Sequence, residues 1–105
     1  MRRRLTALAL GAALIAVEGG AADFTVVQKA RAFSLRQVTI KAGDQVTFTN
    51  EDGVSHNVYS ETKGAEFDFV QRPGAANAVR FSQPGLVEVQ CAIHPVMKLQ
   101  VQVTP

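Results

Sequence analysis

The chain has 105 residues, with 11 basic and 9 acidic side chains and one cysteine. Setting aside the N-terminal Arg2, Arg3, Arg4 and Glu18 removes three basic residues and one acidic residue, which leaves eight of each. This balance predicts no nucleic-acid groove and no polybasic membrane patch. The length allows one domain with a modest core, and a single cysteine excludes a disulfide within the chain.

The first 22 residues have the layout of a secretory signal peptide. A basic start precedes 13 residues of apolar sequence at positions 5–17, and Gly20, Ala21 and Ala22 supply the small residues that a signal peptidase reads. A membrane anchor is the weaker reading, because a spanning helix needs about 20 apolar residues. We therefore expect cleavage after Ala22 and a mature periplasmic domain at residues 23–105. The export route stays open between ordinary secretion and the twin-arginine route.

After residue 22, apolar and polar residues alternate in short stretches, and this pattern favours β-strands. Period-two patterns predict strands at residues 24–28, 33–35, 38–40, 46–50, 56–59, 67–70, 79–81, 86–90 and 99–103. Residues 75–78 admit a short helical turn, although they follow a Pro-Gly turn signal. We expect seven or eight strands with turn signals between them, no long helix and no internal repeat. This pattern predicts an all-β Greek-key sandwich.

The most informative stretch is residues 91–97, which contain Cys91, His94 and Met97 at three-residue intervals. A buried Cys, a core-filling Met or a surface His is ordinary when it occurs alone. Residues 23–105, however, contain one Cys, one Met and two His, and three of these four lie in this stretch. Pro95 disfavours a helix there and predicts a loop. The remaining histidine, His56, opens a predicted strand after a turn.

Two imidazoles, a thiolate and a weak thioether are the donor set of a blue-copper electron-transfer centre. Zinc is the main competitor, but a thioether is a poor ligand for it. A binuclear copper site would need a second cysteine. The sequence therefore predicts one copper ion held by His56, Cys91, His94 and Met97.

The chain resembles the cupredoxins of the plastocyanin and amicyanin group. The resemblance rests on residues 40–50 with His56 and Asn57, and on residues 81–85 with the ligand loop. The gaps between Cys, His and Met are those of amicyanin, whereas plastocyanin has a longer gap before its Met. Gln90 stands where plastocyanin has a Tyr, and the acidic patch of plant plastocyanin has no clear counterpart, so we expect Glu61, Glu66 and Asp68 to form a solvated loop.

The resemblance implies a role for each residue. His56, Cys91 and His94 would be the strong ligands, Met97 the weak axial one, and Asn57 would tie the His56 strand to the ligand loop. His94 would be the surface port for electrons, with Ala92, Pro95 and Val96 as an apolar collar. Simple loop packing explains these three collar residues equally well.

We therefore expect a type 1 copper protein that carries single electrons and is not an enzyme. Its partners would be redox proteins such as a c-type cytochrome, a dehydrogenase or an oxidase; we expect no nucleic-acid partner, no stable membrane insertion after cleavage, and a monomer. Two alternatives stay open. One is a periplasmic copper chaperone or storage protein with the same ligands, and the other is a metal-free cupredoxin-like binding module.

Overall fold

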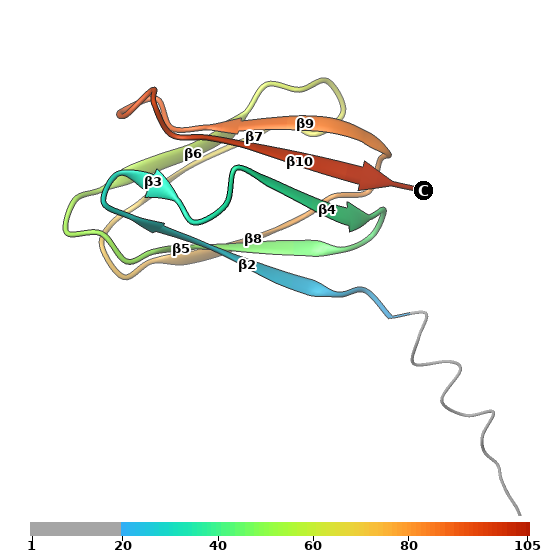
Figure 1. Cartoon of the computed structure of the whole chain (residues 1–105), viewed down its shortest axis with the longest axis horizontal. Helices are drawn as coiled ribbons and strands as arrows, with labels where there is room; N and C mark the ends of the chain where they lie inside the picture. The colour runs from blue at the N-terminus through green and yellow to red at the C-terminus, as the bar shows by residue number, and fades with distance from the viewer. Residues whose placement is uncertain (1–19) are drawn as a thin grey trace, which may run out of the picture.

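Two β-sheets packed face to face form the domain (Figure 1), and the computed structural model describes residues 20–105 of the chain. The strands are β2 (Asp23–Lys29), β3 (Ala32–Phe33), β4 (Gln37–Lys41), β5 (Gln45–Asn50), β6 (His56–Ser60), β7 (Phe67–Gln71), β8 (Ala76–Arg80), β9 (Gly85–Gln90) and β10 (Lys98–Thr104). One sheet has the order β4-β10-β9-β6-β7 and the other β3-β2-β5-β8. The prediction of an all-β sandwich is confirmed.

Alternating side chains determine which face of each strand enters the core. In β10, Leu99, Val101 and Val103 are buried while Lys98 and Gln100 are exposed. Because successive side chains of a strand point to opposite faces, this strand buries one apolar row against the second sheet. It pairs with β4 in parallel and with β9 in antiparallel orientation, and so lies inside its sheet.

The core between the sheets centres on the aromatic ring of Phe48. Its centroid lies 6.3 Å from that of Phe33, 6.2 Å from that of Phe67 and 6.4 Å from that of Phe69. Val46 and Phe48 are fully buried on the inner face of β5, as the alternation of that strand predicts. Aromatic pairs at these separations add to the stabilisation from burial alone.

A buried amide network joins the two sheets next to His56. The Gln28 side chain of β2 donates to Gln71 Oε1 of β7 at 2.5 Å, and Gln71 donates in turn to the carbonyl oxygen of Phe48 at 2.8 Å. Asn50 Nδ2 donates to the carbonyl oxygen of Gln71 at 2.9 Å. Since Gln71 is the register partner of His56, the network braces the start of β6.

The strand count differs slightly from the expectation of seven or eight. The structure has nine strands within residues 20–105, and among them β3 is a separate two-residue strand with three residues between its end and the start of β4. The stretch that admitted a helical turn is instead extended in β8, where Ala76, Asn77 and Ala78 pair with β5. Ladder pairing there outweighs the helical propensity of alanine.

The predicted signal peptide falls almost wholly on residues 1–19, outside the described residues, and stays a prediction. Within residues 20–105, no helix is long and apolar enough to cross a membrane.

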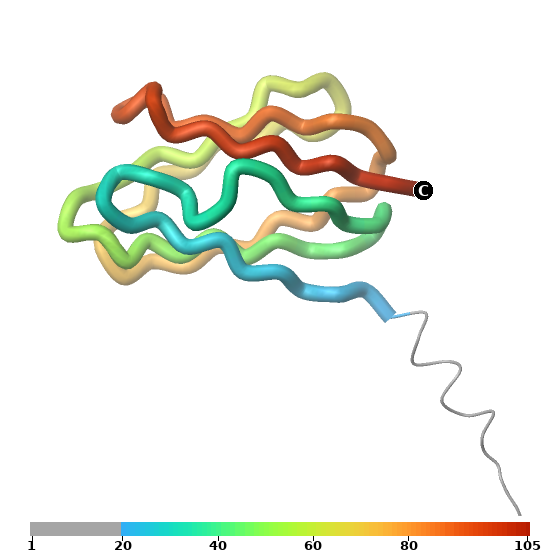
Figure 2. Tube along the Cα trace, in the orientation of Figure 1, coloured from blue at the N-terminus to red at the C-terminus, as the bar shows by residue number. Residues whose placement is uncertain are grey.

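The loop between β9 and β10 and the turn between β2 and β3 lie at the same end of the sandwich, opposite the C-terminus (Figure 2). The β5–β6 loop reaches this end as well, so three segments distant in sequence meet there.

Candidate metal centre

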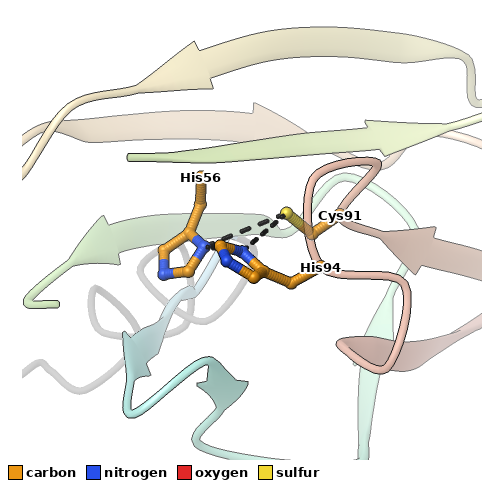
Figure 3. A group of neighbouring side chains, drawn as sticks. All are labelled: His56, Cys91 and His94. Atoms are coloured by element: carbon orange, nitrogen blue, oxygen red, sulfur yellow. Dashed lines mark hydrogen bonds between the residues drawn. The ribbon is translucent and has the colours of Figure 1, made fainter. Parts of the chain in front are cut away.

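Three potential metal ligands converge at this end of the sandwich (Figure 3). The ligand atoms of His56, Cys91 and His94 all lie within 4.8 Å of one another. The Nδ1 atoms of the two histidines are 3.1 Å apart, and each lies 3.9 Å from Cys91 Sγ. One sulfur and two imidazole nitrogens thus face a common point, which is the geometry that a small metal ion with these ligands requires.

Three of the four proposed ligands lie at the end of a strand or directly next to it. His56 is the first residue of β6, Cys91 directly follows β9, and Met97 directly precedes β10. The residues from Cys91 to Met97 form the loop that Pro95 predicts, and the Met97 N–H donates to the His94 carbonyl at 2.9 Å within it. Paired strands on either side fix the ends of this short loop.

Burial separates the two histidines. His56 is 0% exposed, and Cys91 and Met97 are each 1% exposed, whereas His94 is half-buried. Met97 belongs to the apolar core cluster as well as to the loop. His94 is therefore the member of the set that solvent or another molecule reaches first.

Asp52 determines which nitrogen of His56 faces the site. Its Oδ2 lies 3.0 Å from His56 Nε2 and also accepts the backbone N–H of Arg31 at 2.8 Å. A hydrogen bond from Nε2–H to the carboxylate leaves Nδ1 without a proton and free to bind a metal. The pKa of Asp52 is lowered to about 2, chiefly by the hydrogen bond from the Arg31 N–H. Desolvation raises this pKa, and the hydrogen bond with His56 lowers it further. The carboxylate is therefore ionised at neutral pH.

Asn57 links β6 to the ligand loop. The Asn57 side-chain Oδ1 accepts a hydrogen bond from the backbone N–H of Ala92 at 3.0 Å, and the backbone N–H of Asn57 donates to Cys91 Sγ at 3.4 Å. On its other side, Nδ2 donates to Asp68 Oδ1 at 2.6 Å. Asp68 thus lies in β7 and contacts Asn57, in place of the solvated loop position expected for it, while Glu61 and Glu66 are exposed loop residues.

The structure brings His56, Cys91 and His94 together and places Met97 in the same loop. The collar residues Ala92, Pro95 and Val96 are exposed around His94. Sequence reasoning missed Asp52 as the partner of His56. The only available signal was its position four residues before His56, at the turn that precedes β6.

Comparisons with known proteins agree with this geometry. A family model described as copper binding proteins of the plastocyanin/azurin family matches residues 20–104. The chain belongs to this copper-binding family. The donor set fits copper, the metal that this family binds, because a thiol and two imidazoles meet without a carboxylate among them.

Individual relatives support the family assignment. Amicyanin-alpha of Methylorubrum extorquens is 39% identical over 102 residues, which span 92% of this chain and 85% of the relative. The methylamine utilization protein MauL of the same organism is 29% identical over 65 residues, covering 60% of this chain and 57% of its own length. The crystal structure of amicyanin from Paracoccus versutus is 30% identical, covers 77% of this chain and 80% of its own, and superposes with a TM-score of 0.68.

Proposed function

We propose that the protein is a periplasmic one-electron carrier in which His56, Cys91, His94 and Met97 hold one copper ion. The convergence of two Nδ1 atoms and one Sγ within 4.8 Å is the observation that carries this proposal. Bound copper supplies a one-electron couple between Cu(I) and Cu(II). The assignment of a carrier is supported by the likeness to amicyanin-alpha over most of both chains.

The ligand set favours a carrier over an enzyme. His56, Cys91 and His94 act as the strong ligands, and Met97 acts as the weak axial ligand. Four protein ligands leave no open coordination position for a substrate, in contrast to catalytic metal sites that keep one. Electron exchange with another protein is the chemistry that remains.

Rigid ligands make such exchange efficient, because a site that rearranges little between two oxidation states needs little reorganisation. Asp52 holds the ring of His56, and Asn57 holds the loop next to Cys91. The buried amide network at Gln71 braces the same end of β6.

Electrons enter and leave through His94. It is the least buried histidine of the pair, and Val96 beside it is 80% exposed. Ala92, Pro95 and Val96 form an apolar collar suited to a brief and weak docking contact. The partners are redox proteins such as a c-type cytochrome, or an amine-oxidising dehydrogenase, since one relative is described as a methylamine utilization protein.

Stopped-flow mixing tests the function. Reduced protein mixed with an oxidised c-type cytochrome reduces the haem rapidly and keeps its copper when a Cu(I) chelator is present. A copper chaperone with the same ligands would surrender Cu(I) to the chelator quickly and reduce the haem slowly, and this result would contradict the carrier.

Export is tested separately, by expressing the full chain in a bacterium and measuring the mass of the protein in the periplasmic fraction. We expect a mature form that begins at Asp23. Recovery of the uncleaved chain from the cytoplasm or from membranes would contradict this part of the proposal.

A further inference from the structure

A groove of about 860 Å³ lies beside the ligand loop. Its lining includes Pro95, Val96 and Lys98 from the ligand loop and the start of β10, and Arg31 and Arg36 from the segment around β3. Figure 2 shows the β2–β3 turn and the β9–β10 loop at the same end of the molecule. Because Pro95 and Val96 directly follow His94, the groove begins at the proposed electron port.

The groove is positively charged. Arg31, Arg36 and Lys98 line it with a single carboxylate, that of Glu88, and all four side chains are exposed. Within residues 20–105, Arg31, Arg36 and Lys98 form no salt bridge with a carboxylate, so the three groove cations have no ionic partner there. Residues 20–105 have eight basic and eight acidic side chains and no net charge, and yet this one groove carries two positive charges in excess.

Apolar side chains line the same groove. Val96 is 80% exposed and Leu35 is 43% exposed, while Phe33 is 8% exposed. An apolar patch with a charged rim is the usual anatomy of a protein–protein contact.

The turn that presents Arg31 is strained. Ala30 and Arg31 form the two-residue connection between β2 and β3, and their φ angles are +53° and +56°. Non-glycine residues adopt this left-handed conformation at a cost of about 1–2 kcal/mol each. Hydrogen bonds hold the turn in place, since Ser34 N–H donates to the Val27 carbonyl and Arg31 N–H donates to Asp52. Positive φ at both central residues is also the geometry of the two-residue turn that joins paired strands, so the hairpin itself fixes the backbone position of Arg31.

We propose that this groove is the docking site for the acidic face of a redox partner protein. The proposal rests on the proposed carrier function and names the chemistry of the partner. Carboxylates of the partner pair with Arg31, Arg36 and Lys98, and its apolar rim covers Leu35 and Val96. Complementary charges of this kind chiefly raise the association rate and fix the orientation of the complex.

The test uses two forms of one probe, cytochrome c and the same cytochrome after succinylation of its lysines, which makes it acidic. Electron transfer from the reduced copper protein is followed by stopped flow at several salt concentrations. We expect the acidic form to react faster at low ionic strength, and its rate to fall as salt screens the charges.

Matched variants locate the effect. Arg31→Gln with Arg36→Gln removes two charges from the groove, and Lys41→Gln with Lys63→Gln removes two exposed charges outside it. We expect the groove variant to lose about tenfold of its low-salt rate with the acidic cytochrome, in line with the effect of electrostatic steering. The control variant should keep its rate within about twofold on the same grounds. Equal losses in both variants would overturn the proposal.

Amide shift mapping separates the groove from the carrier function. The Cu(I) protein is mixed with the reduced succinylated cytochrome, so that no electron passes, and we expect shifts at Arg31, Arg36 and Lys98. Shifts confined to another face would overturn the proposal that the groove is the docking site. Groove shifts that appear when the protein alone is concentrated would also overturn it, because they would assign the surface to a second copy of the chain. Groove shifts with no electron transfer in the stopped-flow experiment would support the groove and contradict the carrier.

Discussion

At the scale of single residues, Asp52 determines the state of the most buried ligand. His56 is completely buried, and its Nε2 lies 3.0 Å from Asp52 Oδ2. Without that acceptor, the proton of the imidazole has no buried partner on the Nε2 side. The ring would then lose both its orientation and the preference for a free Nδ1.

Replacing Asp52 with alanine should therefore weaken copper binding. Loss of a partner that orients a ligating histidine typically lowers metal affinity about 10–100-fold. Competition with a copper chelator measures this change. Asp52→Asn is the matched control, because it keeps an oxygen acceptor for His56, and we expect most of the affinity to survive. Equal copper affinity in the alanine variant and the native protein would show that Asp52 has no positioning role.

The sequence alone identifies Cys91, His94 and Met97 as a group, because they lie within seven residues of a chain that has few such side chains. It cannot show the link from Asp52 to His56, because that contact depends on how the β5–β6 loop folds back. Likewise, the resemblance to cupredoxins implies that Asn57 ties two segments together, but it does not reveal that Asp68 of β7 is the second partner of Asn57.

At the scale of elements, β10 carries the ligand loop on one end and contacts strands on both sides. Leu99, two residues after Met97, is 1% exposed. Leu99→Ala should lower the free energy of unfolding by about 2–5 kcal/mol, because it removes buried methyl groups and leaves a cavity. Urea denaturation measures the change.

Leu86→Ala is the control for this prediction, since Leu86 lies in the neighbouring strand β9 and is 42% exposed. Its cost should stay below about 1 kcal/mol. Equal losses in the two variants would contradict the assignment of Leu99 to the core.

The turn between β4 and β5 depends on another carboxylate. Asp44 accepts the N–H of Ala22 at 2.9 Å and that of Lys41 at 2.8 Å, and these two bonds, led by that of Ala22, lower its pKa against the opposing effect of burial. A lowered pKa in the folded state stabilises the protein above the ordinary value of 3.8, and this contribution is lost as the pH falls through the folded-state pKa.

Acid unfolding of a protein that begins at Gly20, and so retains Ala22, tests this contribution. Asp44→Asn should lower stability at neutral pH and flatten its dependence on pH below about 4. Glu61→Gln, in an exposed loop, should leave the curve unchanged. A native-like acid slope in the Asn variant would rule out Asp44 as the source.

The alternation of apolar and polar residues predicted strands β2, β5, β9 and β10 well, because each of them buries one regular row of side chains. It was weakest at β8, where the exposed Ala76, Asn77 and Ala78 carry no alternation. That segment is a strand because it pairs with β5, and the local sequence of a segment does not predict pairing with a distant one. The short strand β3 depends in the same way on the left-handed turn at Ala30 and Arg31.

At the scale of the whole molecule, the sandwich places its metal-binding residues and its docking groove at one end. The sheets make the domain rigid, and the β2–β3, β5–β6 and β9–β10 connections carry residues of the metal site and the groove. Strand alternation predicts the class of fold, and the residue types and their spacing predict the proposed ligands, but neither predicts the positive groove beside the port. It needs the β3 segment and the ligand loop to meet in space, although they are about 60 residues apart.

The central claim is that Cys91 and the two histidines bind one copper ion as a type 1 site. The most direct measurement is the visible absorption spectrum of purified protein during titration with Cu(II). We expect an intense blue or green colour that saturates at one equivalent in the native protein, and its loss in Cys91→Ser, because the thiolate–copper bond produces the colour. A colourless native complex, or a colour that survives in Cys91→Ser, would contradict the account.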